Sequence, residues 1–232
     1  MTPAPDLPSE DTRSTILRAA MAEFAEFGEI GARTDAIART AGVNKALLHY
    51  YFGTKKALYE AALDEILKGL KEHYLALLGG PGTPGQRMLR YVLASFDRMA
   101  SSRDYARVLG HEMLRARSGE STSVPRMVQA YFSPLHHAVC HTLEEGIGTG
   151  EFQPMDSAQT ALSITGANVF YFISAPVFRE MTGHDPRQPD MLAQRRLGIL
   201  DLAVSVLFAD RKRGRKLAQA ILCEIPATQV QP

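Results

Sequence analysis

The sequence predicts an all-α fold, with a three-helix helix-turn-helix domain followed by a larger helical bundle. Apolar residues recur at helical spacing through almost every segment of the 232 residues. No segment of useful length alternates apolar and polar residues as a half-buried strand does. Between residues 34 and 58, two short helical segments meet at a glycine, and each begins near a residue suited to capping a helix.

The chain is expected to contain four segments: a flexible N-terminal arm over 1–9, the helix-turn-helix domain over 10–53, a linking helix over 54–78 and the larger bundle over 79–232. The last boundary rests on the loop GGPGTPG, because its glycines and prolines end the preceding helix. The N-terminal residues have neither the basic start nor the apolar core of a signal peptide.

Three short helices are expected in the first domain. The first covers 10–27, and its apolar stripe contains Ile16, Leu17, Ala20, Phe24 and Phe27. Thr34 is expected to cap a second helix over 35–40, which Gly42 closes in a left-handed conformation. Val43 is then a buried turn residue, and Asn44 caps a third helix from Lys45 to about Tyr51.

The third helix is expected to expose most of its surface. Leu48 and Phe52 lie four residues apart and can both face the core. The remaining side chains include a Lys, a His and two Tyr, which suit phosphate oxygens and base edges. With the helix starts beside them, the candidate DNA-contacting residues are Thr34, Asn44, Lys45, Ala46, Leu47, His49, Tyr50, Tyr51 and Lys55. The alternative is an amphipathic helix of a bundle with half-buried tyrosines at its edge.

Further helices are expected over 54–78, 86–101, 105–116, 125–146, 157–182 and 189–213. The last two are apolar on more than one side, which indicates burial on two sides. A four-helix dimer interface provides such burial, and so does the centre of a large monomeric bundle.

Composition is that of an ordinary globular protein, with 45% hydrophobic and 22% charged residues. The net charge is only +1, but residues 33–59 contain five basic residues and one acidic residue, a local charge of +4 that favours DNA. Cys140 and Cys223 are too far apart to form a zinc-ligand pattern, so a reducing cytoplasm is the simplest location. No apolar run reaches the length that spans a membrane.

Two other groups of residues have more than one interpretation. His136, His137, Cys140 and His141 lie on one expected helix, where pairs four residues apart either share a metal or are simply surface and core residues. The basic run 211–216 is interpreted as a solvated helix end whose cations complement the helix dipole, or as extra nucleic-acid contact. No metal site and no cofactor is predicted. Because catalytic motifs are absent from the sequence, we expect no enzyme.

Residues 11 to about 67 resemble the N-terminal domain of the tetracycline-repressor (TetR) family of bacterial transcription regulators. The resemblance covers about a quarter of the chain, with the family's spacing throughout. It is carried by Ile16, Leu17, Ala19, Ala20, Phe24, Gly28, Thr34, Ile37, Ala38, Ala41, Gly42, Val43, Leu48, Tyr51, Phe52, Lys55 and Leu58. Residues 171–186 resemble one branch's C-terminal domain more weakly. The chain departs from the family pattern at Leu47, His49 and Asn44, which bears on the operator that is read.

The resemblance implies a homodimer through the last two long helices, a palindromic DNA operator and a small-molecule effector that releases it. We therefore expect a repressor, with 79–232 as the ligand-binding and dimerisation domain and the linking helix as transmitter. Candidate effector-lining residues mix large apolar side chains with a few polar groups. They are Phe96, Met113, Tyr131, His137, Asn168 and Tyr171. The alternatives are a constitutive DNA-binding regulator without a ligand, and a small-molecule-binding protein with a vestigial DNA domain.

Overall fold

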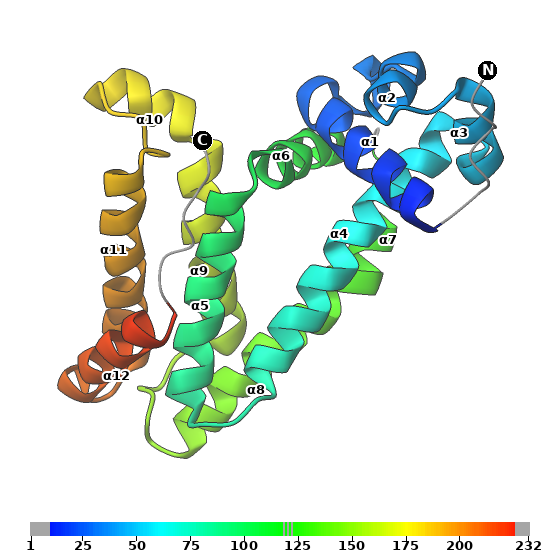
Figure 1. Ribbon diagram of the computed structural model, residues 1–232. Helices are drawn as coiled ribbons and strands as arrows, with labels where there is room; N and C mark the ends of the chain where they lie inside the picture. Colours follow the sequence, from blue (N-terminus) through cyan, green and yellow to red (C-terminus); the bar gives the residue numbers. More distant parts are fainter. Residues whose placement is uncertain (1–9, 118, 120, 122, 226–232) are drawn as a thin grey trace. The chain divides into compact units, whose positions relative to one another are not determined.

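The computed structural model describes residues 10–117, 119, 121 and 123–225, and in this part of the chain it contains helices and no strand. The expected arm over 1–9 lies outside the described residues. The helices are α1 (Glu10–Gly31), α2 (Thr34–Thr40), α3 (Lys45–Phe52), α4 (Lys55–Leu78), α5 (Pro84–Ser101), α6 (Arg103–Arg117), α7 (Val124–Met127), the π-helical turn η1 (Val128–Phe132), α8 (Ser133–Gly148), α9 (Ser157–Ile173), α10 (Ala175–Thr182), α11 (Pro189–Leu207) and α12 (Arg211–Glu224) (Figure 1). The all-α prediction is confirmed.

The chain forms two compact units, residues 1–69 with 107–124 and residues 70–106 with 125–232. Both α4 and α6 therefore pass from one unit to the other. The division differs from the expected boundary at 79, because the last turns of α4 pack with the second unit and most of α6 packs with the first. The four-segment division by function stays a proposal.

The first unit is built around the apolar side of α1. Ile16, Ala20 and Phe24 are buried, and the ring of Phe24 meets that of Tyr59 from α4 edge-on, with 4.8 Å between centroids. Two details differ from the expectation. Helix α1 continues to Gly31 through a kink at Gly28, whose φ is +67°. Phe27 is 55% exposed, because it lies outside the stripe that packs against the other helices.

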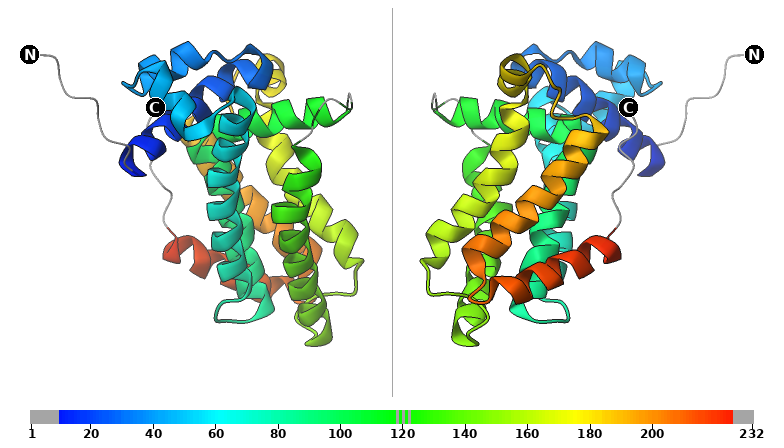
Figure 2. Two further views of the ribbon diagram at one scale, coloured as in Figure 1. Left: turned by 90° about the vertical axis from the view of Figure 1, so that its right-hand side faces the viewer. Right: turned by 90° about the vertical axis from the view of Figure 1, so that its left-hand side faces the viewer.

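The second unit has α5 at its centre, in contact with α8, α9, α11 and α12. Figure 2 shows α9 and α11 from two sides, with α12 crossing the end of α11. The core residues of α5 are almost completely enclosed by these helices. They are Met88, Leu89, Val92, Leu93 and Phe96.

The two longest expected helices are each broken, which corrects the sequence prediction. The segment 157–182 divides at Ser174 into α9 and α10, which are bent by 64°. Pro176 stands in the first turn of α10, where its missing N–H costs nothing, whereas inside a continuous helix it would remove a hydrogen bond. Among the described residues no single helix could cross a membrane, and only this bent pair passes by length and composition.

The segment 189–213 also ends early. Helix α11 stops at Leu207, and Asp210 caps the new helix α12 by accepting hydrogen bonds from the backbone N–H groups of Lys212 and Arg213 at 2.9 and 3.1 Å. The extended residue between them, Phe208, is buried and stacks edge-on against Phe152 with 5.2 Å between centroids. The basic run therefore begins a helix, so the interpretation that its cations complement a C-terminal dipole was wrong.

Helix 125–146 is likewise not uniform. It begins as α7, passes through the π-helical turn η1 and continues as α8 to Gly148. Pro134 comes directly after the π-helical turn, in a continuous helical run to which it cannot donate a backbone hydrogen bond. The His and Cys residues of the candidate metal group lie on α8. His136 contacts Cys140 at 3.5 Å, but among the described residues no three His, Cys, Asp or Glu side chains are arranged to hold a metal ion.

Candidate nucleic-acid interface

Helices α2 and α3 form the expected helix-turn-helix pair. The turn between them closes with Gly42, whose φ of +69° lies in the left-handed region that favours glycine. Asn44 caps α3, since its Oδ1 accepts a hydrogen bond from the backbone N–H of Leu47 at 2.7 Å. This confirms the predicted cap and the predicted turn. Val43 is half-buried rather than buried.

The cap predicted for α2 is wrong. Arg33 occupies the cap position, its side chain does not bond to the helix, and Thr34 is already the first helical residue. The backbone N–H of Arg33 instead donates to Oε1 of Glu23 from α1 at 3.0 Å. The carboxylate from α1 therefore satisfies the N–H of the cap residue itself, while the N–H groups of Ala36 and Ile37 bond to the carbonyl oxygen of Arg33.

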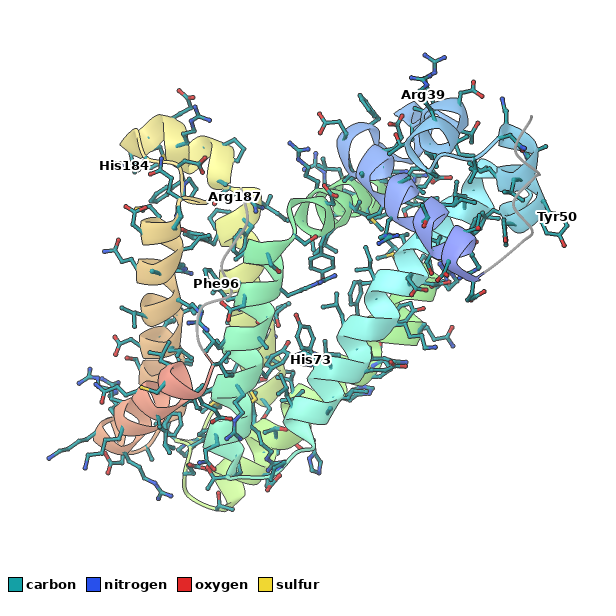
Figure 3. The ribbon with its side chains drawn as sticks, in the orientation of Figure 1. Arg39, Tyr50, His73, Phe96, His184 and Arg187 are labelled. Carbon is teal, nitrogen blue, oxygen red and sulfur yellow. The ribbon has the colours of Figure 1, made fainter. Side chains whose placement is uncertain are left out.

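Helix α3 is anchored by two side chains, as predicted. Leu48 is 1% exposed and Phe52 is 9% exposed, and the guanidinium of Arg13 from α1 lies 5.6 Å above the ring of Phe52. The opposite side of α3 carries the polar and aromatic candidates. Tyr50 is 72% exposed, and Figure 3 shows it pointing away from the helices of this unit.

Several candidates on α3 already have partners within the chain. The ammonium of Lys45 forms an ion pair with Asp35 at 2.9 Å, and this hydrogen bond lowers the pKa of the Asp35 carboxyl. The Nδ1 atom of His49 lies 2.6 Å from the carbonyl oxygen of Gly53. The ring of Tyr50 meets that of Tyr51 edge-on, with 5.6 Å between centroids. These contacts fix side-chain positions while the outer edges of His49 and Tyr50 remain exposed.

Lys55 has a structural role that the sequence did not reveal. Its ammonium donates to the carbonyl oxygens of Ile30 and Ala32 at 2.9 and 3.2 Å, so it ties the start of α4 to the end of α1. Two neighbouring cations, Lys56 and Arg39, are exposed, and no described residue forms an ion pair with either. Lys56 lies in the first turn of α4, and Arg39 lies in the last turn of α2.

The candidate effector residues do not all lie in one place. Phe96, Asn168 and Tyr171 meet at the contact of α5 with α9, where the rings of Phe96 and Tyr171 are 6.0 Å apart. The Nδ2 atom of the buried Asn168 donates to the carbonyl oxygen of Val92 at 3.1 Å and to Oγ of Ser95 at 2.6 Å. A neighbouring helix therefore satisfies the amide nitrogen, whereas Oδ1 has no hydrogen-bond partner in the described part of the chain.

The other three candidates lie on other helices. Tyr131 belongs to η1, with the ammonium of Lys71 lying 5.4 Å from its ring centroid, and His137 is exposed on α8. Met113 is 49% exposed and belongs to the first compact unit. A single lining made by all six residues stays a prediction.

Known protein families match both parts of the chain. Residues 16–62 match the family described as bacterial regulatory proteins, tetR family, and residues 84–203 match the tetracyclin repressor-like C-terminal domain. The transcriptional regulator BetI of Rhizobium meliloti is 33% identical over 84 residues, which are 36% of this chain and 41% of BetI. The chain therefore matches less than half the length of this relative.

Solved structures share the fold over most of the chain. A regulator from Saccharomonospora viridis in complex with choline is 18% identical and superposes with a TM-score of 0.68, covering 87% of this chain and 100% of that one. The regulator FadR from Bacillus subtilis in complex with stearoyl-CoA is 20% identical, with a TM-score of 0.64 over 82% of this chain and 96% of that one.

Proposed function

Since this chain belongs to the TetR family of bacterial transcription regulators, we propose that it is a repressor which binds a palindromic operator as a homodimer and is released by a small molecule. The observation that carries the proposal is the construction of α3. Its two apolar anchors are buried and its cap is made by Asn44, so a short helix with an exposed polar face is held rigidly at the surface of its unit.

The exposed face of α3 is proposed to enter the major groove. Lys45, His49 and Tyr50 would reach base edges or groove walls, and Ala46 with Leu47 would contact thymine methyl groups. Tyr51 and Thr34 would lie against phosphates. The ammonium of Lys55 keeps only one N–H donor beyond its two carbonyl partners. Lys56 and Arg39 are therefore proposed as the stronger phosphate contacts.

The DNA proposal is tested by selecting bound fragments from random duplex DNA and then comparing variants on the selected operator. Lys45→Ala is expected to change base preference at a cost of about 1–3 kcal/mol at the contacted position. Lys56→Ala is expected to weaken binding to all sequences and to lower the salt slope by about one unit. The control is Lys68→Ala, an exposed lysine about three turns further along α4 than Lys56. Unchanged base preference in Lys45→Ala, with an unchanged salt slope in Lys56→Ala, would refute the assignment.

A second copy of this chain is proposed to cover the apolar face of α9, α10 and α11. Its large apolar side chains are between 42% and 76% exposed: Leu162, Phe170, Ile173, Val177, Met181, Leu197 and Leu202. Two glycines in the middle of these helices, Gly166 and Gly198, have open space where a Cβ would stand. Glycine there costs about 1 kcal/mol of helix stability relative to alanine, and close approach of a partner helix explains why it is present.

The dimer face is tested by sedimentation equilibrium of Phe170→Glu. Its expected result is a monomer with much weaker operator binding, because only a dimer places two recognition helices in successive major grooves about 34–36 Å apart. The control is Leu114→Glu, which changes a comparably exposed leucine of the first unit. A dimeric Phe170→Glu together with a monomeric Leu114→Glu would place the interface elsewhere.

The effector is proposed to bind in the second unit and to act through α4 and α6, the two helices that continue into the unit containing α3. A ligand shifts DNA affinity only if it prefers one conformation of these helices. Two fold neighbours are in complex with choline and stearoyl-CoA, so this fold holds ligands of different charge. Fluorescence anisotropy of a labelled operator, titrated with candidate effectors, distinguishes this proposal from a constitutive regulator, whose DNA affinity no small molecule would change. As a DNA-binding regulator, the protein would act in the bacterial cytoplasm.

A further inference from the structure

Three tyrosines and one arginine form a cluster within the second unit, in which the charge of Arg98 acts on Tyr74 and Tyr105. Tyr74 comes from the last turns of α4, Tyr91 and Arg98 from α5, and Tyr105 from the start of α6. Tyr91 and Arg98 are seven residues apart and share a face of α5, because seven residues make two helical turns. The rings of Tyr74 and Tyr91 stand perpendicular with 5.4 Å between centroids. Both tyrosines are less than 7% exposed, whereas Tyr105 and Arg98 are partly buried.

Arg98 differs from Arg87 and Arg196, the two arginines that are most deeply buried among the described residues of this unit. Arg87 pairs with Glu145 at 2.6 Å, and Arg196 forms two hydrogen bonds with Asp97 at 2.8 and 2.9 Å. Within the described residues, the guanidinium of Arg98 has no ion pair and no hydrogen bond, and its Nε atom is buried. Asp97, its sequence neighbour, accepts both hydrogen bonds from Arg196, although its charge also acts on Tyr74. A partly buried cation without an anion is costly, so the site has an unmet requirement for negative charge.

The tyrosine hydroxyls around Arg98 are neutral donors. Burial raises the pKa of Tyr74 above its usual range, and burial raises that of Tyr105 to about 12, while the charge of Arg98 opposes both shifts. The hydroxyl of Tyr91 is already hydrogen-bonded to Thr165 of α9. No described residue forms a hydrogen bond with the hydroxyl of Tyr74 or Tyr105. A guanidinium and two phenolic O–H groups therefore remain as donors, with aromatic ring faces beside them.

We propose that Arg98, Tyr74 and Tyr105 hold the polar end of the effector, and that the effector is a small organic anion such as a carboxylate or sulfonate with an apolar body. The assignment rests on the proposed function and names the chemistry of its effector. Charge-assisted hydrogen bonds from a guanidinium to an anion are short and directional, and the ring faces of Tyr74 and Tyr91 would pack against the apolar body. None of these four residues was among the effector candidates taken from the sequence.

The principal rival is a quaternary ammonium ligand such as choline. Aromatic rings attract such cations, and three tyrosines would provide a suitable cage. Arg98 disfavours this ligand, because a second positive charge at the same site is repelled where little water screens it. The charge of Arg98 thus decides between two ligands that the tyrosines alone would accept.

The test compares two fluorescent probes of nearly the same shape, 8-anilino-1-naphthalenesulfonate, which is an anion, and N-phenyl-1-naphthylamine, which is neutral. Arg98→Gln is expected to weaken binding of the sulfonate about tenfold and to leave the neutral probe within twofold. The control is Arg90→Gln, since Arg90 lies on the same helix and pairs with Glu224 at 3.0 Å. Tyr105→Phe keeps the ring, and is expected to weaken binding of the sulfonate several-fold without changing the circular dichroism spectrum.

Three results would overturn the proposal. One is unchanged sulfonate affinity in Arg98→Gln, another is equal loss of both probes, and the third is binding of choline by the unaltered protein in calorimetry. Operator binding without any probe is measured in parallel. If the sulfonate binds through Arg98 but no anion changes operator affinity, the ligand-responsive function fails while the anion site stands. If operator affinity responds only to neutral or cationic compounds, the function stands and the anion site fails.

Discussion

The hydroxyl of Tyr59 is predicted to stabilise the first unit by about 2 kcal/mol. It donates to Oε1 of Glu112 at 2.7 Å, and that carboxylate is 1% exposed. Its other donors are Nη1 of Arg115 at 3.2 Å and Oγ of Ser121 at 2.6 Å. Tyr59→Phe removes one of three donors and keeps the ring that packs edge-on against Phe24. A hydrogen bond to a charged group contributes about 1.5–3 kcal/mol, and two remaining donors place the loss near the middle of that range.

The assay is urea unfolding followed by circular dichroism, with Ser121→Ala and the double variant alongside. Because both hydroxyls donate to one carboxylate, the losses in the double variant are expected to be non-additive by about 0.5 kcal/mol or more. A loss below about 0.5 kcal/mol in Tyr59→Phe, with an unchanged m-value, would refute the network as a source of stability.

The side chain of Tyr59 is also predicted to affect how the free energy of unfolding changes at alkaline pH. Burial, and next the hydrogen bond to Glu112, raise the pKa of Tyr59 in the folded protein. The unfolded chain loses this proton near pH 10 while the folded chain retains it, so the contribution of Tyr59 to stability is complete below pH 10 and declines above it. Tyr59→Phe should therefore lose less stability than the unaltered protein between pH 10 and 11, by up to about 1.4 kcal/mol per pH unit.

Three further predictions concern the cap of α3, the packing of α8 and the alkaline limit of the second unit. Asn44→Ala should lower the free energy of unfolding by about 1 kcal/mol, whereas Asn44→Asp should retain most of it, as thermal unfolding can measure. Gly146→Ala should cost about 1–3 kcal/mol because its Cβ would stand 2.1 Å from Cδ2 of Phe152, whereas Gly148→Ala, with open space at its Cβ, should be neutral or stabilising. Tyr105, whose pKa rises from 10.0 to about 12, should add to the loss of stability between these pH values, and Tyr105→Phe should show a shallower decline in chemical unfolding at pH 10 to 12.

Local patterns determined the fold class and the form of α3. Leu48 and Phe52 are four residues apart, Asn44 precedes the helix, and Gly42 ends the one before it, so each prediction needed only neighbouring residues. The structure confirmed the two anchors, the cap and the turn. Such features are readable because helix periodicity and capping act over a single turn of the chain.

The predictions of where helices are capped and where they end failed when the deciding partner was distant in sequence. Glu23 accepts a hydrogen bond from the N–H of Arg33, ten residues later, at the start of α2 where Thr34 was expected to be the cap. The break after Leu207 depends on Phe208 packing against Phe152, 56 positions away, so the apolar run appeared to continue as one helix. Pro176 was visible, but periodicity on both sides of it outweighed the signal.

The ionic roles were decided by tertiary structure alone. The sequence shows that Lys55 and Arg98 are basic, but not that Lys55 meets two carbonyls at the end of α1 or that Arg98 has no partner among the described residues. Composition and spacing predict which residues of a single segment are buried. Which charge is neutralised depends on helices brought together from distant parts of the chain, and the free energy of a charge depends on those neighbours and on its burial.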